Sequence, residues 1–325
     1  MKVHILDDWF DTLRHLPSFA RLDGHDVTVW NDHTEDLDLL AERLSGADCV
    51  VLFRERTPMT DALLQRLPNL KLISQRGVYP HVDVPACTAN GVLLCSNMGA
   101  DGVSVAASEL TFALILASAR QIPQQMASLR AGQWQMGVGQ TLAGRRLGLY
   151  GYGRIARQVA TYAKAFGMKV WWWASDEGRA RVAVDGAEVA PDRASFFGQS
   201  DFVSVHVRLT PATKGIITAA DLTAMKPGAS FVNTSRSGLV EKGALEAALA
   251  AGRPGRLALD VFDVEPLTDA TDPVVSHPNV IGTPHIGFVT EDELDKQFAD
   301  IYDQINAYGQ GAPIHMINPE VRGQA

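Results

Sequence analysis

Cysteine is scarce in this 325-residue sequence, which contains only Cys49, Cys87 and Cys95. The three are odd in number and lack metal-ligand spacing. We therefore interpret them as reduced core residues, and not as a disulfide framework or a metal site. Positive charge is also in short supply, since 29 Lys and Arg stand against 37 Asp and Glu, a net charge of −8. A chain with this balance and no long basic run is a poor candidate for binding nucleic acid or an anionic membrane.

Long hydrophobic runs are missing as well. The most apolar helical stretch, 110–119, is too short to span a bilayer. The N-terminus, MKVHILDD, lacks the charged-then-apolar pattern of a signal segment. We therefore expect a cytoplasmic protein. Hydrophobic residues still make up 46% of the chain, which is enough for a sizeable buried core.

Short apolar runs alternate with helical patterns over the first hundred residues. The runs that predict strands are 3–6, 27–30, 49–52, 72–74 and 92–95. The segments between them with helical spacing are 37–44, 61–67 and 83–89. This alternation predicts a parallel sheet that is covered on both faces by helices.

A second alternating set follows a long apolar helix predicted at 104–120. Its predicted strands are 147–150, 170–173, 202–206, 230–234, 257–261 and 280–283. Helices are predicted among and after these strands, notably at 154–166, 241–250 and 291–308. The predicted fold class is therefore α/β with two doubly wound parallel-sheet domains, and the last helix is expected to return to the first of them.

A glycine-rich turn follows the strand 147–150 and opens the next helix. It reads Gly151-Tyr152-Gly153-Arg154-Ile155-Ala156. The first glycine permits a tight turn, the second lets the backbone approach a pyrophosphate, and a small last residue lets helix and strand pack closely. The N-terminus of the helix offers its N–H groups to the phosphates. A turn without a ligand and a methyl-donor nucleotide are the alternatives, but strand, motif and helix together favour a dinucleotide. The buried stripe of this helix is predicted to consist of Ile155, Val159, Tyr162 and Phe166.

Three successive predicted strands are each followed by an ionisable residue. These are Arg236 in FVNTSRSG, Glu265 in LALDVFDVEP and His285 in NVIGTPHIG. Ligands of open parallel sheets bind beyond the carboxyl ends of the strands, so we expect the three side chains in one crevice. An arginine can hold a carboxylate, a histidine can transfer a proton near neutral pH, and a neighbouring glutamate favours the imidazolium. With a nicotinamide, the set suits hydride and proton transfer between a 2-hydroxy acid and a 2-keto acid. Singly, each residue has an ordinary interpretation as a loop, capping or solvated side chain.

At this point the sequence resembles the D-isomer-specific 2-hydroxyacid dehydrogenases. The resemblance is carried by GQTLAGRRLGLYGYGRIA, SDFVSVHVRLTPATKGIIT, MKPGASFVNTSRSGLVEKGAL, ALDVFDVEP and TPHIG, and more loosely by LFRERTPMT and LKLISQRG. It implies a Rossmann cofactor domain at 102–288, inserted into a flavodoxin-like substrate domain built from 1–101 and 289–325. It also implies a cleft that closes on binding, and a homodimer formed through residues 104–134.

The resemblance also implies individual roles. Arg236 would hold the substrate carboxylate and carbonyl, His285 would be the general acid/base, and Glu265 would be its partner. Asp260 would face the nicotinamide amide. The residues expected to contact the cofactor are Gly151, Tyr152, Gly153, Arg154, Ile155, Ala174, Ser175, His206, Arg208, Thr234, Ser235 and Asp260.

The substrate contacts expected outside the cofactor domain are Arg54, Arg56 and Gly77. Gly77 matches a loop whose backbone N–H groups hold the substrate carboxylate in the family. That family commonly has a second glycine where Tyr79 stands, and the following Pro80 has no N–H to donate. The two arginines follow the third predicted strand, where one of them reaches the distal group of the substrate or both belong to a solvated basic loop.

The strand predicted at 170–173 contains three successive tryptophans, expected to be buried on both faces. It ends before Ala174, where an acid would bind the ribose 2′-hydroxyl of NAD and repel the 2′-phosphate of NADP. Arg179 and Arg208 are candidates for pairing with such a phosphate, while Asp176 is a candidate for replacing the missing acid. The cofactor is therefore predicted to be NAD or NADP, with NADP narrowly favoured, and no metal is predicted.

The sequence thus predicts an NAD(P)-dependent D-2-hydroxyacid dehydrogenase that runs as a 2-keto acid reductase. Its expected substrate is of the kind used by phosphoglycerate dehydrogenase or by glyoxylate and hydroxypyruvate reductases. Two alternatives stay open, namely a nucleotide-sensing corepressor-like protein on the same scaffold and a formate dehydrogenase. No regulatory domain follows residue 325, which argues against the long, feedback-regulated form of phosphoglycerate dehydrogenase. A methyl-donor ligand does not account for Arg236, Glu265 and His285 together.

Overall fold

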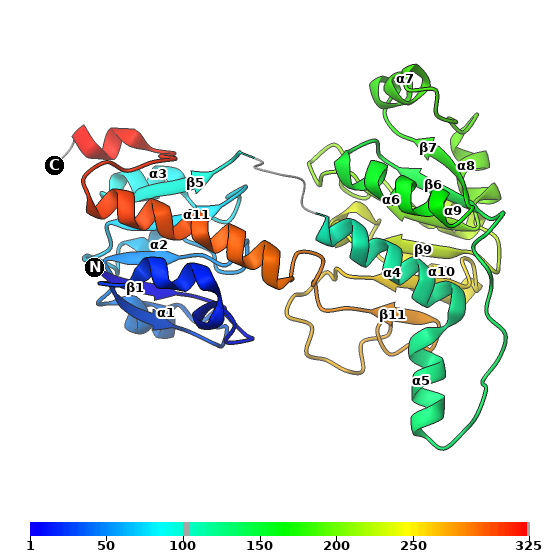
Figure 1. Cartoon of the computed structure of the whole chain (residues 1–325), viewed down its shortest axis with the longest axis horizontal. Helices are drawn as coiled ribbons and strands as arrows, with labels where there is room; N and C mark the ends of the chain where they lie inside the picture. The colour runs from blue at the N-terminus through cyan, green and yellow to red at the C-terminus, as the bar shows by residue number, and fades with distance from the viewer. Residues whose placement is uncertain (100–104, 324–325) are drawn as a thin grey trace. The chain divides into compact units, whose positions relative to one another are not determined.

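The computed structural model describes residues 1–99 and 105–323, which fall into two compact units (Figure 1). Unit 1 comprises Met1–Gly102 and Thr290–Ala325, and unit 2 comprises Val103–Val289. Each unit contains one parallel sheet with helices on both faces, which confirms the predicted α/β fold class. Ser104, the predicted start of the long helix, and the predicted boundary at 101–102 lie outside the described residues.

The sheet of unit 1 has the strand order β2-β1-β3-β4-β5. Its strands are β1 (Lys2–Ile5), β2 (Asp26–Val29), β3 (Cys49–Val51), β4 (Leu72–Arg76) and β5 (Leu93–Asn97). All four neighbouring pairs are parallel. This is the flavodoxin-like order, which places a topological switch point between β1 and β3.

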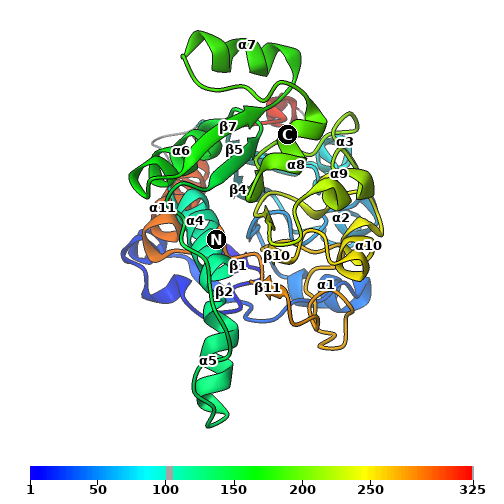
Figure 2. The same ribbon diagram turned by 90° about the vertical axis from the view of Figure 1, so that its right-hand side faces the viewer.

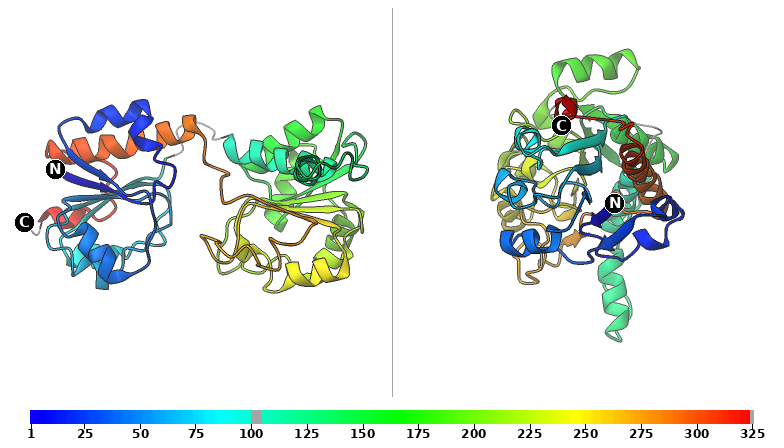
Figure 3. Two further views of the ribbon diagram at one scale, coloured as in Figure 1. Left: turned by 90° about the horizontal axis from the view of Figure 1, so that it is seen from below. Right: turned by 90° about the vertical axis from the view of Figure 1, so that its left-hand side faces the viewer.

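The two faces of this sheet are covered by different segments of the chain (Figure 3). One face packs on α1 (Leu37–Leu44), α2 (Asp61–Leu64) and α3 (Val84–Ala89). The other packs on α11 (Glu291–Gly309), which also contacts the 3-10 helices η1 (Leu13–His15) and η2 (Pro17–Leu22).

The C-terminal tail, which includes η4 (Pro319–Gly323), covers the edge of β5. Cys95 forms an antiparallel bridge with Met316, and the Leu94 N–H donates to Asn318 Oδ1 at 2.7 Å. The tail therefore satisfies an edge strand that would otherwise present unpaired backbone groups.

The sheet of unit 2 has the strand order β11-β10-β9-β8-β6-β7. Its strands are β6 (Arg146–Tyr150), β7 (Lys169–Trp173), β8 (Phe202–Val205), β9 (Ser230–Asn233), β10 (Arg256–Leu259) and β11 (Val280–Gly282). Val189 adds a parallel bridge to Trp172 on the outer side of β7. With that bridge counted as a strand, the order is the Rossmann order, and the switch point lies between β6 and β8.

Helices cover both faces of this second sheet (Figure 2). One face packs on α4 (Ala106–Arg120), α6 (Arg154–Ala165) and α7 (Asp176–Val184). The other packs on α8 (Arg193–Gln199), α9 (Ala219–Ala224) and α10 (Ala244–Ala251). Helix α5 (Ile122–Arg130) follows α4 and has no buried residue, and the 3-10 helix η3 (Ser237–Leu239) follows β9.

Burial of the tryptophans on β7, predicted for all three, is found for two of them. Trp171 and Trp172 are 2% and 3% exposed and lie in different core clusters, while Trp173 is only partly buried. The indole N–H of Trp171 donates to Ser200 Oγ at 2.8 Å. Gly148 on the neighbouring strand makes room for this contact, because a Cβ there would lie 2.5 Å from Ser200 Oγ.

The predicted stripe of α6 is wrong at two of its four positions. Ile155 and Phe166 are 39% and 49% exposed. The buried residues are Ala156, Val159, Ala160 and Ala163. Helix α4 packs against α6, and small alanines allow that close approach, whereas larger side chains move to the margin.

The remaining core predictions concern the cysteines and the apolar helix. All three cysteines are buried free thiols, and burial raises the pKa of Cys87 and of Cys95 to about 12. They are thus core residues, as predicted, and poor nucleophiles. Among the helices of the described ranges, none combines the length and the apolar character needed to cross a membrane.

Candidate active site

The glycine turn joins β6 to α6 at the switch point of the unit 2 sheet. Gly151 has φ +103°, and a Cβ there would lie 2.4 Å from the carbonyl oxygen of His206, so only glycine fits. A Cβ on Gly153 would meet only that same oxygen, at 4.0 Å. The space beside Gly153 is therefore open to a ligand rather than filled by the protein.

Helix α6 begins at this open space without a side-chain cap on its N-cap residue Gly153. Uncapped N–H groups at a helix N-terminus, together with its dipole, favour an anion. Arg154 and Ile155 lie exposed on the first turn. A pyrophosphate fits this set of donors, and residues 151–155 would hold it.

Tyr152 and His206 flank the turn in different ways. The ring of Tyr152 packs edge-on against Trp172 at 4.7 Å, and its hydroxyl donates to Asp185. His206 Nε2 lies 2.8 Å from Ser204 Oγ, while its buried Nδ1 has no hydrogen-bond partner within the described ranges. Burial lowers the pKa of His206 to about 4, so this imidazole is neutral at neutral pH.

The end of β7 brings together the residues on which cofactor choice was expected to depend. Arg179 donates to the Ala174 carbonyl at 3.1 Å and lies 4.3 Å above the Trp173 ring. It also forms an ion pair with Asp176. Ser175 caps α7 by accepting the Gly178 N–H at 3.2 Å. Arg179 and Asp176, a candidate arginine and the candidate acid, therefore bind each other. The other candidate arginine, Arg208, is exposed on the segment after β8.

The hydroxyls that follow β9 make contacts within unit 2. Thr234 Oγ1 lies 2.7 Å from Thr111 Oγ1 on α4, and Ser235 Oγ donates to the Val205 carbonyl at 2.7 Å. The next residue, Arg236, donates from Nη1 to the Ser235 carbonyl at 2.7 Å. These bonds fix the segment that carries Arg236 at the carboxyl end of the sheet.

His285 and Glu265 come together at the same end of the sheet. His285 Nδ1 lies 2.6 Å from Glu265 Oε2, and Glu265 Oε1 accepts the Phe262 N–H at 2.9 Å. Burial acts to raise the pKa of Glu265, but the hydrogen bond and charge of His285, the Phe262 N–H and the charge of Arg236 together lower it. The carboxylate therefore stays ionised and orients the imidazole through Nδ1, which leaves Nε2 as the atom for proton transfer.

The loop that carries His285 is held by the fully buried Asp260, which follows β10. Asp260 Oδ1 accepts from Thr283 Oγ1 at 2.6 Å and from the Ile286 N–H at 2.8 Å, and Oδ2 accepts the Gly287 N–H at 2.9 Å. These donors stand on both sides of His285, whose backbone has a left-handed φ of +53°. A non-glycine residue in this conformation persists where its surroundings determine it, and Asp260 supplies them. The sequence suggested a cofactor contact for Asp260 and did not reveal this anchoring role.

In unit 1 the predicted substrate residues follow the adjacent strands β3 and β4. Arg56 donates to the Asp7 carbonyl at 2.8 Å and lies 4.1 Å above the Trp9 ring and 4.6 Å from the Phe53 ring. Arg54 has a left-handed φ of +64°. Arg56 therefore belongs to a structured cluster with Asp7, Trp9 and Phe53 at the carboxyl end of β3. Asp7 and Trp9 were missed, although their place directly after β1 was a signal for them.

Gly77 follows β4 with a left-handed φ of +90°, and no atom lies within 4 Å of where its Cβ would be. Its own N–H does not face a ligand, because it donates to the Asn97 carbonyl at 3.0 Å. The predicted role of this loop in binding substrate therefore depends on the N–H groups that follow Gly77.

Together these features define a dinucleotide-binding α/β domain with a histidine–carboxylate pair and an arginine at the carboxyl end of its sheet. Residues 112–287 match the model of the D-isomer specific 2-hydroxyacid dehydrogenase, NAD binding domain. The chain belongs to the D-isomer-specific 2-hydroxyacid dehydrogenase family.

Individual relatives agree with this assignment. The chain is 38% identical over 275 residues to D-3-phosphoglycerate dehydrogenase of Methanocaldococcus jannaschii, a match over 84% of this chain and 52% of that enzyme. It thus spans about half the length of that relative. It is 33% identical to hydroxypyruvate reductase of Thermotoga maritima over 87% of this chain and 92% of that enzyme. The crystal structure of phosphoglycerate oxidoreductase from Vibrio cholerae superposes with a TM-score of 0.90 at 43% identity, covering 96% of this chain and all of that one.

Proposed function

We propose that this protein is an NAD(P)-dependent D-2-hydroxyacid dehydrogenase that reduces a 2-keto acid. The observation that carries the proposal is the 2.6 Å contact between His285 Nδ1 and Glu265 at the carboxyl end of the unit 2 sheet. The glycine turn lies in the same unit and has room for a pyrophosphate beside Gly153. A histidine oriented by a carboxylate is the side-chain pair that proton transfer to a carbonyl oxygen requires.

The chain's own residues divide the work as follows. Arg236 binds the substrate carboxylate and polarises the neighbouring carbonyl. His285 gives a proton from Nε2 to the carbonyl oxygen, and Glu265 stabilises the charged imidazole and fixes its orientation. The bound dihydronicotinamide supplies the hydride for the carbonyl carbon. Asp260 holds the His285 loop through three hydrogen bonds. Because its carboxylate is fully buried, the expected hydrogen bond with the nicotinamide amide would require the carboxylate to become accessible.

We propose further that NADP is accepted and narrowly preferred. Ala174 offers no carboxylate to a ribose 2′-hydroxyl, and Asp176 is already paired with Arg179. The guanidinium of Arg179 lies at the Ala174 carbonyl, where the ribose of a dinucleotide binds in this fold. Parallel measurements of kcat/KM with NADPH and NADH test this for the wild type, Arg179→Ala, Arg208→Ala and Asp176→Ala. A strong NADH preference that survives Asp176→Ala, with NADPH use unchanged in both arginine variants, would refute it.

The distal group of the substrate is proposed to meet the arginines after β3. Arg56 supports this best, because Trp9 and Phe53 hold its guanidinium in a fixed place. Arg56→Met and Arg54→Met can be compared on 2-keto acids with and without a distal acidic group. A loss confined to the acidic substrates identifies the arginine that contacts them, and equal losses on both kinds exclude the contact.

We also propose a homodimer formed through α4, α5 and the residues that follow. Apolar side chains are exposed along this segment, including Met126 (47%), Leu129 (59%) and Trp134 (78%). Such a row is typical of an interface with another protein. Light scattering should give a dimer for the wild type and a monomer for Leu129→Asp, and a wild-type monomer would contradict the proposal.

The reaction itself is tested with a panel of 2-keto acids that includes glyoxylate, hydroxypyruvate and pyruvate, each assayed with NADH and NADPH. Loss of nicotinamide absorbance with at least one of them is expected. Absence of turnover throughout the panel would contradict the proposal and favour a nucleotide-sensing binding protein. Formate-dependent reduction of NAD would instead indicate a formate dehydrogenase.

A further inference from the structure

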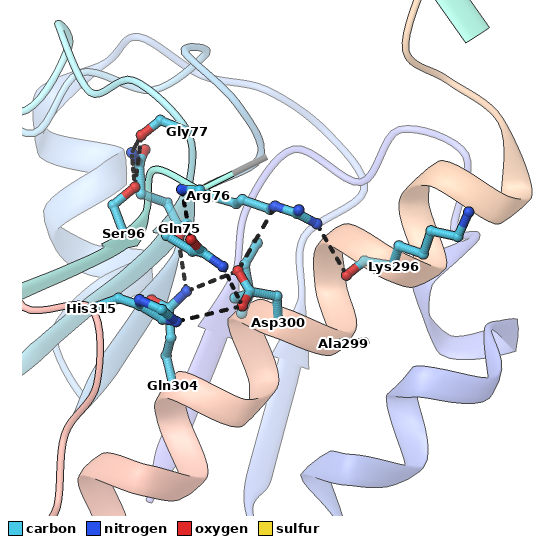
Figure 4. Close-up of polar contacts among 12 residues, drawn as sticks. Gln75, Arg76, Gly77, Ser96, Lys296, Ala299, Asp300, Gln304 and His315 are labelled. Carbon is cyan, nitrogen blue, oxygen red and sulfur yellow. Dashed lines mark hydrogen bonds and ion pairs between the residues drawn. The ribbon is translucent and has the colours of Figure 1, made fainter. Parts of the chain in front are cut away.

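Two buried polar side chains, Gln75 and Ser96, form hydrogen bonds with the loop that follows β4 (Figure 4). Gln75, 1% exposed, donates from Nε2 to the Gly77 carbonyl at 3.3 Å, to the Val78 carbonyl at 3.2 Å and to Ser96 Oγ at 3.1 Å. Ser96 Oγ, on the neighbouring strand, donates to the Gly77 carbonyl at 2.7 Å. Two successive carbonyl groups of the loop are therefore drawn toward the interior of unit 1.

Because the peptide group is planar, the direction of these carbonyl groups also fixes the direction of the N–H groups that follow them. In a trans peptide the C=O and the following N–H point in opposite directions. Because the Gly77 and Val78 carbonyls point inward, the Val78 and Tyr79 N–H groups point away from Gln75. Two successive N–H groups turned the same way can together bind one anion.

The neighbouring positions limit the site to these two donors. The Gly77 N–H is engaged by the Asn97 carbonyl at 3.0 Å, and Pro80 has no N–H. Val78 is 43% exposed, so its surroundings are open to a ligand. Tyr79 and Pro80 thus depart from the family's glycine pattern without removing the two donors that Gln75 arranges.

We propose that Gln75, assisted by Ser96, is a positioning residue that preorganises the Val78 and Tyr79 N–H groups to bind the substrate carboxylate. The inference rests on the proposed 2-keto acid reductase activity. It adds a residue that does not touch substrate but decides how tightly the substrate's carboxylate is held.

A glutamine at position 75 carries a free-energy penalty, which supports a role in positioning the loop over a role in packing alone. Its Oε1 is buried and has no partner among residues 1–99 and 105–323. A buried acceptor without a partner is unfavourable, and an apolar side chain of similar size would avoid the penalty. The orientation of its amide is fixed by the two carbonyl oxygens, which only the NH₂ group can serve.

The strand end that carries Gln75 is itself held rigidly by α11 (Figure 4). Gln304 Nε2 donates to the Gln75 carbonyl at 3.1 Å, and the Arg76 guanidinium donates to the Lys296 carbonyl at 3.4 Å. Asp300 accepts a hydrogen bond from Asn97 at 3.0 Å on the adjacent strand. The anchor is therefore fixed independently of the loop that it holds.

The test compares Gln75→Met, which removes the donor at similar volume, with Gln75→Glu, which replaces the donor by an acceptor of the same shape. In the whole chain, Gln75→Met should raise KM for the best 2-keto acid of the panel about tenfold, equivalent to about 1.4 kcal/mol. The dissociation constant of the nicotinamide cofactor should stay unchanged. Gln75→Glu should raise KM further, because a negative charge then lies close to the substrate carboxylate.

Ser74→Ala is the matched control. Ser74 lies one residue earlier on β4, is fully buried, and donates to the Ile301 carbonyl and to Gln304 Oε1 rather than to the loop. It removes buried hydrogen bonds at the same strand and should leave KM unchanged. Equal KM increases in Ser74→Ala and Gln75→Met would show general loosening and overturn the positioning role.

Two further results separate the possible failures. A wild type that turns over a 2-keto acid, with KM unaffected by Gln75→Met, overturns this inference alone. A wild type inactive on the whole panel overturns the proposed function and the inference with it. If Gln75→Met does not fold, Ser96→Ala supplies the test. Amide hydrogen exchange at Val78 and Tyr79 should then show less protection by substrate than in the wild type, and equal protection would overturn the inference.

Discussion

Each unit has a loop that follows a strand and is held by one buried polar side chain. The side chain in unit 2 accepts hydrogen bonds from its loop, whereas the side chain in unit 1 donates hydrogen bonds to its loop. In unit 2 the Asp260 carboxylate accepts the two N–H groups that follow His285. In unit 1 the Gln75 amide donates to the carbonyl oxygens of Gly77 and Val78. An acceptor draws N–H groups inward, whereas a donor draws carbonyls inward and turns N–H groups outward. The chemistry of one anchoring side chain therefore decides which backbone groups a loop presents.

The two side chains that hold the loops also differ in charge, since Asp260 is a carboxyl group and Gln75 is a neutral amide. Burial raises the pKa of Asp260, but hydrogen bonds from Thr283, Ile286 and Gly287 oppose that effect. A charged acceptor makes stronger hydrogen bonds than a neutral one, which suits a loop that must hold His285 in a strained conformation. The loop in unit 1 is proposed to bind an anion, and a neutral amide holds it without repelling that anion.

The largest effect on turnover is expected from His285→Ala, which removes the proposed general acid/base from the unit 2 loop. Turnover should fall by about 10²–10⁴-fold, the range for loss of a general acid or base. Cofactor affinity should be nearly unchanged, because the glycine turn is untouched. Steady-state kcat and a fluorescence titration with the cofactor measure the two quantities. Near-normal turnover would contradict the catalytic assignment.

A large effect on stability is expected from Asp260→Ala. It leaves two N–H groups and one hydroxyl without their acceptor, at a cost on the order of 3 kcal/mol in the free energy of unfolding. Gln75→Met should cost less, about 1 kcal/mol. Ser96 still serves the Gly77 carbonyl, the Val78 carbonyl belongs to an exposed residue, and removal of the buried Oε1, which has no partner among the described residues, offsets part of the loss. Urea unfolding of both variants compares them. Equal losses would show that the two anchors do not differ as described.

A smaller effect is expected from Gly77→Ala in the unit 1 loop. Gly77 has φ +90° and open space around its Cβ position, so the penalty is backbone strain of about 1–2 kcal/mol. Gly24 has the same φ and the same open surroundings, and Gly24→Ala is the control. Both variants should lose similar thermal stability, but only Gly77→Ala should raise KM. A KM increase in both variants would contradict a specific role of the Gly77 loop in substrate binding.

The smallest effect is expected from the ionisation of Glu265. Its folded-state pKa is lowered, so its contribution to stability is present above its ordinary value of 4.5 and is lost as pH falls through the lower folded value. The side chains of Glu265 and His285 are 33% and 30% exposed, and water screens their interaction. The difference in unfolding free energy between wild type and Glu265→Gln should shrink below about pH 4.5. A difference that grows there would reverse the assigned direction.

The sheets could be read largely from the sequence, because their strands are short apolar runs bounded by turns. Each of the eleven strands in the described ranges lies at a predicted run, with ends that differ by at most two residues. Helices α7, α8 and α9 were not individually predicted, since they are short and bury few residues, as α7 does with Gly178 and Val182. The stripe of α6 was predicted incorrectly because the packing of α4 selects the alanine face.

The catalytic candidates were predicted because each follows one of three successive strands, and most of the cofactor residues were predicted from the family resemblance. The roles assigned to them stay predictions. Their anchors were harder to find. Asp260 binds donors 23 to 27 residues away, and Gln75 binds Ser96 on the next strand. Such partners are set by which strands are neighbours in the sheet, which residue spacing does not reveal.

The sequence by itself determined the family, the two parallel sheets, and the turn at which Gly151 must be glycine. These follow from local patterns: apolar runs, a strand–turn–helix motif, and ordered blocks of residues. Only the tertiary structure decided which backbone groups each loop presents, that Asp176 pairs with Arg179, and that the Gly77 N–H is taken by Asn97. These depend on hydrogen bonds between segments distant in the chain, and the direction of a peptide group is fixed only when its partner is in place.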